Sequence, residues 1–254
     1  VLEGMTLDDK YTYPGSGGVL VHRLGIRDLG RLDHALNDYA SVAWVQLRQM
    51  PPPEPPGFGY LQTIHREMFG SLLDWAGELR ETDVQATGTG IAYARPEYIS
   101  ESLQSLFRKL EREDFLSGLD SPAFTDRLAD RWGELSAIHP FRDGNTRSQS
   151  AYISAIAERA GHPIDWTAID VPTLRNLRLV AVAGRHEPLA AYLRDHLVSS
   201  TDASLDRGWS AARLAGLDTP FKPGAGRSTA AGLDSFGTTT YRADPGVGRT
   251  GAGR

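Results

Sequence analysis

Apolar side chains recur every three or four positions along much of this chain, which is the spacing of one face of an α-helix. The first such stretch covers residues 26 to about 50, and the second begins after the proline-rich segment 51–57. Proline ends a helix because it lacks the amide hydrogen and clashes with the preceding turn. The pattern therefore predicts two helices, with apolar faces made of Leu29, Leu32, Leu36, Tyr39 and Ala43 in the first and Leu61, Ile64, Met68, Leu72 and Trp75 in the second.

The same spacing returns further along the chain. We expect helices around residues 103–110 and 124–135, and a third that ends at Gly161, since glycine commonly follows the last helical residue. At least one more helix is expected between Val171 and Val198. The predicted fold class is mainly α, a helical bundle whose later apolar positions are Leu103, Phe107, Leu110, Phe124, Leu128, Trp132, Leu135, Tyr152, Ile153, Ile156, Ala157 and Ala160.

Residues 82–97 differ from the helical pattern. Two glycines, Gly88 and Gly90, alternate with threonines and separate short runs of β-branched and aromatic residues. Glycine supplies the positive φ that tight β-turns require, so the segment predicts a β-hairpin. The alternative is an ordinary surface excursion between two helices.

The two ends of the chain differ in composition from its middle. Residues 1–19 contain Pro14, Gly15, Gly17 and Gly18, and we expect an extended segment rich in turns. Residues 199–254 are rich in glycine and poor in large apolar residues, and we expect a disordered tail. The predicted folded domain is therefore residues 20–198.

The composition excludes several classes of protein and site. The net charge is −5, so no overall basic field indicates a nucleic acid partner. The chain has no cysteine, which rules out disulfides and thiolate metal sites. No apolar run approaches the roughly 20 residues of a membrane span, and the N-terminal sequence lacks the layout of a secretion signal. We therefore expect a cytoplasmic protein without a membrane partner.

The stretch IHPFRDGNTRSQS, residues 138–150, carries the candidate chemistry between two predicted helices. Each residue has an ordinary interpretation by itself: His139 as a structural histidine, and Asp143 or Asn145 as a cap of the next helix. Arg147 does not fit that interpretation, because the first turn of a helix favours acidic residues. Its position indicates an anionic ligand.

Taken together, these residues predict a phosphate-binding site. Gly144 allows close approach of the backbone, and the helix that starts near Asn145 directs its amides and its positive dipole end to the same place. Asp143 is suited to hold Mg²⁺ against phosphate oxygens, and Arg147 adds a charged donor. His139 is the candidate general base, because histidine titrates near neutral pH. The chain contains neither a P-loop nor a dinucleotide-binding glycine motif.

The string HPFRDGNTR resembles the signature of the Fic (filamentation induced by cAMP) family, His-x-Phe-x-Asp/Glu-Gly-Asn-Gly-Arg-x-x-Arg. The positions that match are His139, Phe141, Asp143, Gly144, Asn145 and Arg147. The resemblance extends to YTYPG near the N-terminus, to TIHREMFGSLLDWAGELRETDV at 63–84 and to the hairpin, so it covers residues 11 to about 198. It implies a Fic-fold helical bundle with a β-hairpin flap at 82–97 and the signature loop at 139–150.

The resemblance also implies an activity, the transfer of AMP from ATP to a hydroxyl side chain of a target protein. His139 would deprotonate that hydroxyl, and Asp143 would hold the Mg²⁺ that bridges the α- and β-phosphates. Phe141 would anchor the loop in the core. The phosphates would be bound by Gly144, Asn145, Thr146 and Arg147, where charge develops in the transition state.

The family implies protein partners as well. A segment of the target would add to the flap as an extra strand, and Ile91 or Tyr93 would clamp it. The chain is similar to Fic toxins that are restrained by a separate antitoxin and that modify the ATPase subunits of type II topoisomerases. The residues of the flap that would hold the target are Gly90, Ile91, Ala92 and Tyr93.

Two positions depart from the signature. Thr146 replaces a glycine, and Ser150 replaces the final arginine, which in the family holds the γ-phosphate and receives the glutamate of an inhibitory helix. The printed sequence also lacks the Ser/Thr-x-x-x-Glu-Gly/Asn inhibitory motif. Two alternatives to AMP transfer from ATP follow: a Fic-fold transferase that uses another nucleotide donor, and a catalytically silent Fic-like module that binds a protein partner.

Other aromatic and histidine residues have simpler interpretations. Trp75 and Trp132 are expected in the core. His65 and His162 are expected at the surface or as caps, because neither has a partner at metal-ligand spacing.

Overall fold

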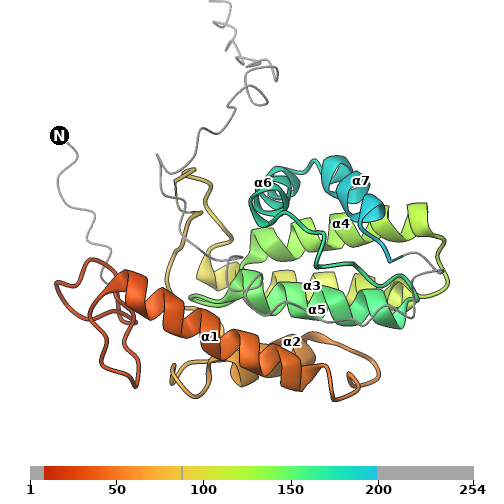
Figure 1. Cartoon of the computed structure of the whole chain (residues 1–254). Coiled ribbons are helices and arrows are strands. Elements are labelled where there is room, and N and C mark those ends of the chain that lie inside the picture. The colour runs from red at the N-terminus through yellow and green to blue at the C-terminus, as the bar shows by residue number, and fades with distance from the viewer. Residues whose placement is uncertain (1–8, 87, 199–254) are drawn as a thin grey trace, which may run out of the picture. The chain divides into compact units, whose positions relative to one another are not determined.

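The computed structural model describes residues 9–86 and 88–198, which lie within one compact unit. These residues form seven α-helices and one 3-10 helix (Figure 1). The mainly α fold class predicted from the sequence is confirmed, while the predicted tail at 199–254 lies outside the described residues. In chain order the elements are α1 (Leu29–Leu47), α2 (Phe58–Phe69), α3 (Pro96–Arg112), η1 (Asp114–Leu116), α4 (Ser121–Ile138), α5 (Asn145–Arg159), α6 (Val171–Val182) and α7 (Glu187–Asp195).

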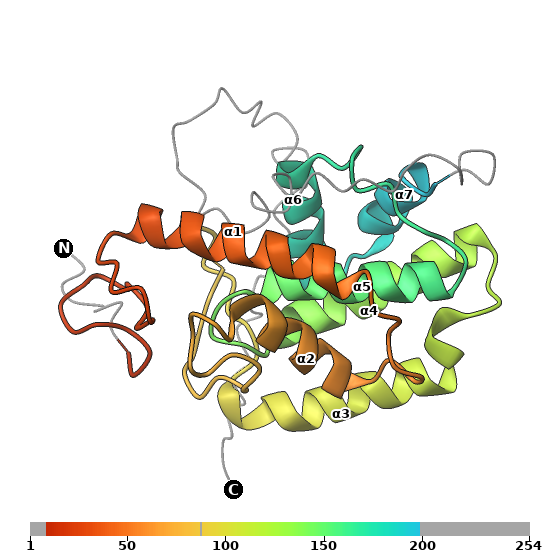
Figure 2. The same ribbon diagram turned by 60° about the horizontal axis from the view of Figure 1, so that its bottom comes forward.

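Helix α4 lies at the centre of the bundle, where it contacts α3, α5, α6 and α7. α1 packs on α2, and α2 packs on α5, so this pair covers the side of the bundle away from α6 and α7 (Figures 1 and 2). The signature loop joins α4 to α5 and therefore begins at the end of the central helix. The core beside it is filled by rings that are at most 1 % exposed, those of Phe69, Phe124, Trp132, Phe141 and Tyr152.

Aspartate side chains start three of the helices. Asp28, Asp120 and Asp170 each precede a helix and accept a hydrogen bond from an amide of its first turn, at 2.8 to 3.0 Å. Such a cap satisfies an amide that has no partner inside the helix. α5 differs, because it follows Gly144 and starts without a side-chain cap.

The buried face of α1 differs from the predicted one. Leu29 and Tyr39 were expected in the core, but they are 53 % and 41 % exposed. Tyr39 lies about 80° around the helix from Leu47, at the edge of the buried stripe, because successive residues turn by about 100°. Leu29 is the first residue of α1, at the end of the helix. The buried stripe consists of Leu32, Leu36, Ala40, Ala43, Trp44 and Leu47.

The predicted β-hairpin at 82–97 is not confirmed. The chain does turn back on itself, and one isolated antiparallel bridge joins Gln85 to Ala92. Ala86 N–H donates to the Ile91 carbonyl at 2.8 Å, and no strand is present among the described residues of this segment. We call residues 82–94 the flap turn. Its pairing is too short to form a ladder, although Gly88 and Gly90 adopt the positive φ that was expected of them.

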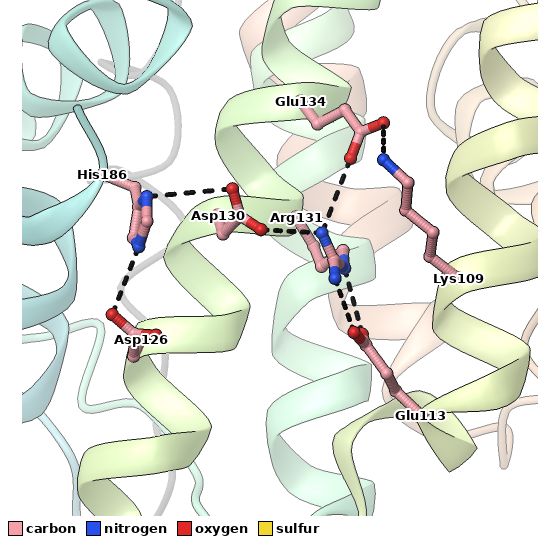
Figure 3. Close-up of polar contacts among 7 residues, drawn as sticks. All are labelled: Lys109, Glu113, Asp126, Asp130, Arg131, Glu134 and His186. Carbon is pink, nitrogen blue, oxygen red and sulfur yellow. Dashed lines mark hydrogen bonds and ion pairs between the residues drawn. The ribbon is translucent and has the colours of Figure 1, made fainter. Parts of the chain in front are cut away.

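Charged side chains link α3, α4 and α7 (Figure 3). Arg131 of α4 donates from Nε to Glu113 Oε2 at 3.0 Å and from Nη2 to Glu113 Oε1, and Nη1 donates to Asp130 at 2.7 Å. The hydrogen bonds from Arg131 lower the pKa of Glu113, because they favour its charged form. This bidentate pair therefore attaches the end of α3 to α4.

The same network reaches α7 through His186. Its Nε2 lies 3.2 Å from Asp126 Oδ1 and its Nδ1 lies 3.7 Å from Asp130 Oδ1, both on α4 (Figure 3). On the other side of α4, Lys109 of α3 forms an ion pair with Glu134 at 2.7 Å.

No helix within residues 9–86 and 88–198 combines the length and the apolar character of a membrane span.

Candidate active site

His139 ends helix α4 in a left-handed backbone conformation, with φ 49° and ψ 64°. Its N–H still donates to the Leu135 carbonyl at 3.1 Å. A left-handed residue with a side chain costs about 1–2 kcal/mol, so the surrounding structure must hold it there. Such strain is common at functional sites, which agrees with the candidate role of His139 as the base.

The imidazole of His139 stacks on the ring of Tyr93 in the flap turn. The ring centroids are 3.7 Å apart and the planes are 6° from parallel. The structure therefore brings the predicted base and one predicted flap residue into direct contact. Gly90, Ile91 and Ala92 lie nearer the tip of the turn, where Gly90 and Ala92 are exposed and Ile91 is partly buried.

Gly144 connects the loop to α5, and only glycine fits there. Its φ is 74°, and a β-carbon at this position would lie 2.4 Å from Cε2 of Phe69. The backbone can therefore pass directly over the Phe69 ring. The uncapped first turn of α5 follows at once, and a helix N-terminus of this kind favours an anion.

Asp143 sits immediately before this helix start. Its Oδ1 accepts hydrogen bonds from the Gly144 N–H and from Arg147 Nη2, the latter at 3.1 Å. Its side chain is 34 % exposed, so the carboxylate is accessible from solvent. The described residues contain no cluster of three or more His, Cys, Asp or Glu that could hold a metal. A single accessible carboxylate suits Mg²⁺ only where substrate phosphates and waters supply the other ligands.

Asn145 closes the loop with both ends of its amide. Its Oδ1 accepts from the Phe141 N–H at 2.9 Å, and its Nδ2 donates to the Phe141 carbonyl at 2.7 Å. The side chain is buried, so it shapes the loop from inside. In this structure its amide bonds the loop itself, and the α-phosphate contact predicted for it remains a prediction. Thr146, the next residue, is partly exposed in the first turn of α5.

Arg147 is buried in α5 and linked to α1. Nη1 donates to Asn37 Oδ1 at 2.7 Å, Nη2 donates to Asp143, and the guanidinium lies 4.9 Å above the Phe69 ring. Asn37 was not predicted, because nothing in its local sequence shows that α1 crosses the start of α5.

His65 was predicted at the surface or as a cap, and that prediction is wrong. The ring is fully buried, with its centroid 3.9 Å from that of Phe141. Nδ1 accepts from the Gly77 N–H at 2.9 Å, so Nε2 carries the proton and donates to the Asp143 carbonyl at 2.8 Å. His65 therefore fixes the backbone of the candidate metal ligand. A lone histidine in an amphipathic helix gives no signal of such a long-range bond.

Ser150, which stands where the family signature has its final arginine, is fully buried in α5. Its hydroxyl has no hydrogen-bond partner among the described residues. The preceding Gln149 accepts from Arg178 of α6 at 2.9 Å. Arg178 also donates to Ser136 at 3.0 Å, so this arginine is directed between α4 and α5.

The N-terminal segment also contacts the loop. Asp9 Oδ2 accepts from Nε of Arg142 at 2.7 Å, and both side chains are mostly buried. Thr82 at the base of the flap turn donates to the same oxygen at 3.4 Å. The segment before α1 therefore borders the loop from the side of the flap turn.

Comparison with known proteins gives one consistent family. Residues 58–157 match the Fic/DOC family. The chain is 34 % identical over 164 residues to "Probable protein adenylyltransferase Fic" of Escherichia coli K12, an alignment that covers 64 % of this chain and 78 % of that protein. It is 29 % identical over 194 residues to "Protein adenylyltransferase VbhT" of Bartonella schoenbuchensis, covering 76 % of this chain but only 40 % of that longer protein.

A solved structure agrees with the sequence matches. The BepC protein of Bartonella tribocorum, crystallised with bound AMPPNP, has a TM-score of 0.67 and 26 % sequence identity, and the match covers 75 % of this chain and 97 % of that one. The fold of this chain is therefore similar to that of a protein crystallised with a bound nucleotide analogue.

Proposed function

The chain belongs to the Fic/DOC family of protein adenylyltransferases, and from this premise we propose that it transfers AMP from ATP to a hydroxyl side chain of a target protein. One observation carries the proposal. His139 follows the last residue of α4 and Asp143 lies two residues before α5, so the two stand at the ends of one short loop, beside an uncapped helix N-terminus.

The reaction uses these groups in turn. The hydroxyl oxygen of the target forms a bond to the α-phosphorus, its proton passes to His139, and the bond from that phosphorus to the β-phosphate oxygen breaks. Pyrophosphate leaves, and AMP stays on the target. Asp143 would hold Mg²⁺, which neutralises charge on the α- and β-phosphates when bound. The backbone at Gly144 and the first turn of α5 would stabilise the charge that develops on the α-phosphate.

ATP is the proposed donor, supported by the AMPPNP bound to the Bartonella tribocorum relative. Ser150 favours a second candidate, another nucleotide donor. A buried serine supplies no positive charge for a γ-phosphate, and Arg178 is occupied with Ser136 and Gln149. A donor that does not depend on γ-phosphate recognition would fit this site equally well.

The partners follow from the resemblance. We propose that the target binds at the flap turn, with a type II topoisomerase ATPase subunit as the candidate, and that a separate antitoxin protein restrains the activity. The reaction would take place in the bacterial cytoplasm.

Incubation of the purified chain with Mg²⁺, bacterial lysate and ATP labelled at either the α- or the γ-phosphate tests the proposal. We expect a lysate protein labelled only from the α-phosphate, no label with His139→Ala, and full label with His162→Ala, whose ring bonds the Leu119 carbonyl just before α4 instead. Label from GTP, CTP or UTP but not from ATP would establish the other donor. No label from any of the four would leave a silent binding module as the better interpretation.

A further inference from the structure

Arg80 is a buried cation at the base of the flap turn, and its side chain is bonded to main-chain oxygens. It is 2 % exposed. Nε donates to the His139 carbonyl at 2.8 Å, Nη1 to Thr82 at 2.7 Å, and Nη2 to Ile138 at 3.2 Å and to Ala94. Among the described residues no carboxylate accepts from it. A buried charge with this environment is unusual, since arginine normally takes a carboxylate or phosphate partner.

The four acceptors belong to two segments, and Arg80 holds these segments in a fixed position relative to each other. Thr82 and Ala94 lie at the two ends of the flap turn, and Ile138 and His139 form the end of α4. Main-chain bonds reinforce the same junction: Arg80 N–H donates to the Pro140 carbonyl at 2.9 Å, and Ala94 N–H donates to that of Ala137 at 2.9 Å. The last carbonyls of a helix have no partner inside it and carry its negative dipole end, so a cation is favourable here.

This junction controls the surroundings of the candidate base. His139 has the left-handed backbone described above, and its own carbonyl is one of the acceptors. Tyr93, whose ring stacks on the imidazole, directly precedes Ala94, which is another acceptor. Arg80 therefore fixes the backbone on both sides of the Tyr93–His139 stack.

We propose that Arg80 is a positioning residue for His139. It holds the left-handed backbone of the histidine and the position of Tyr93, so that one face of the imidazole is covered and its edge is directed at the target hydroxyl. Arg80 touches neither nucleotide nor target. The inference rests on the proposed function, because it assigns a support to the base of that reaction.

The nucleotide side of the loop has other supports. His65 holds Asp143, Asn145 holds Phe141, and Asn37 holds Arg147. None of these bonds involves Arg80. Loss of Arg80 should therefore slow the transfer step and leave nucleotide binding nearly unchanged. Misplacement of a catalytic group by about 1 Å commonly lowers a rate about 100-fold.

The test compares Arg80→Lys and Tyr93→Leu with wild type. Lysine keeps the charge but cannot reach four separated carbonyls, and leucine at position 93 removes the stack while Arg80 and its four acceptors stay in the chain. We expect kcat at saturating ATP to fall about 100-fold with Arg80→Lys and about 10-fold with Tyr93→Leu, and AMPPNP affinity to stay within about 3-fold. The double variant should lose little more than Arg80→Lys alone, because both changes act through His139.

Arg178→Lys is the matched control, because Arg178 is also buried against α4 but bonds Ser136 and Gln149. It should keep wild-type kcat. NMR signals of the His139 ring and backbone provide a readout that does not need activity, and Arg80→Lys should shift them while those of Gly144 stay in place. If wild type shows no transfer, the proposed function fails, and these NMR shifts still decide the role of Arg80.

Two results would overturn the inference. One is a folded Arg80→Lys protein with unshifted His139 signals and kcat within about 3-fold of wild type. The other is a parallel loss of kcat and AMPPNP affinity, which would indicate a general structural role. Should Arg80→Lys fail to fold, Arg80→Gln, which is also unable to reach four carbonyls, replaces it in the same two measurements.

Discussion

The amide oxygen of Asn37 in α1 accepts a hydrogen bond from Arg147 Nη1 in α5 at 2.7 Å, although the two residues are 110 positions apart. Arg147 is the cation proposed to face the nucleotide phosphates. Asn37→Ala removes this acceptor from a buried guanidinium, so we expect AMPPNP to bind about 10-fold more weakly by isothermal titration calorimetry. The neighbouring exposed residue supplies the control, Asp38→Ala, which should bind as wild type does. Equal affinity of the Asn37→Ala protein would mean that α1 does not support the phosphate site.

Gly144 allows a second prediction. Gly144→Ala places a methyl group against the Phe69 ring and should lower both Tm and transfer activity, the latter more than about 100-fold. Gly161→Ala is the matched control, because Gly161 also has a positive φ, 78°, but a β-carbon there meets nothing within 4 Å. It should cost only about 1 kcal/mol of unfolding free energy and retain activity. Similar behaviour of the two variants would show that the contact with Phe69 is unimportant.

His65 gives a third prediction, one that concerns the metal. His65→Ala removes the bond to the Asp143 carbonyl, so the carboxylate is held less firmly. We expect the Mg²⁺ concentration for half-maximal transfer to rise about 10-fold, in line with other residues that orient metal ligands. A Mg²⁺ titration of activity measures this, with His162→Ala as the control. An unchanged Mg²⁺ requirement in a folded His65→Ala protein would contradict the assignment of Asp143.

The Glu113–Arg131 pair predicts a pH dependence of stability. The folded protein lowers the pKa of Glu113 below its ordinary value of 4.5, so the unfolded chain binds more protons in that range. The stabilisation is therefore complete above pH 4.5 and is lost as the pH falls through the lower folded value. Glu113→Gln should reduce the unfolding free energy by about 1 kcal/mol at pH 7, and this deficit should shrink as the pH falls below 4.5.

Urea unfolding at a series of pH values, from about pH 7 to below 4.5, checks this prediction, with the exposed Glu111→Gln as control. A deficit that stays constant across the whole range would mean that the charge of Glu113 is not its source.

The buried hydroxyl of Ser150 leads to a fifth prediction. It has no hydrogen-bond partner among the described residues, so its burial is unfavourable. Ser150→Ala should raise the unfolding free energy by about 1 kcal/mol and leave transfer unchanged. Thermal unfolding and the labelling assay measure the two effects. A loss of activity would instead indicate that the hydroxyl contacts the donor.

Much of the fold could be predicted from apolar spacing, because helix positions are set by local sequence. The helices around residues 124–135 and before Gly161 appear as α4 and α5, and the break at 51–57 separates α1 from α2. The flap was less predictable. Its glycines fix a turn, but the length of strand pairing depends on neighbours that local sequence does not reveal.

The candidate site likewise has a part that local sequence predicts and a part that depends on distant segments. His139, Asp143, Gly144 and Arg147 stand in one short motif, and their proximity follows from the loop itself. Their supports, Asn37, His65 and Arg80, come from segments more than 50 positions away in sequence. Each is a common residue type without a local motif, so only the packed structure shows what it contacts.

The oxygens that Arg80 contacts all belong to the main chain, and every amino acid carries such an oxygen. Side chains at Thr82 and Ala94 can therefore be exchanged during evolution without loss of these acceptors. The arginine itself has no such freedom, because no other residue reaches four carbonyls. A saturation scan of positions 80, 82 and 94 should consequently find Arg80 intolerant and both acceptor positions tolerant, although Arg80 never touches the substrate.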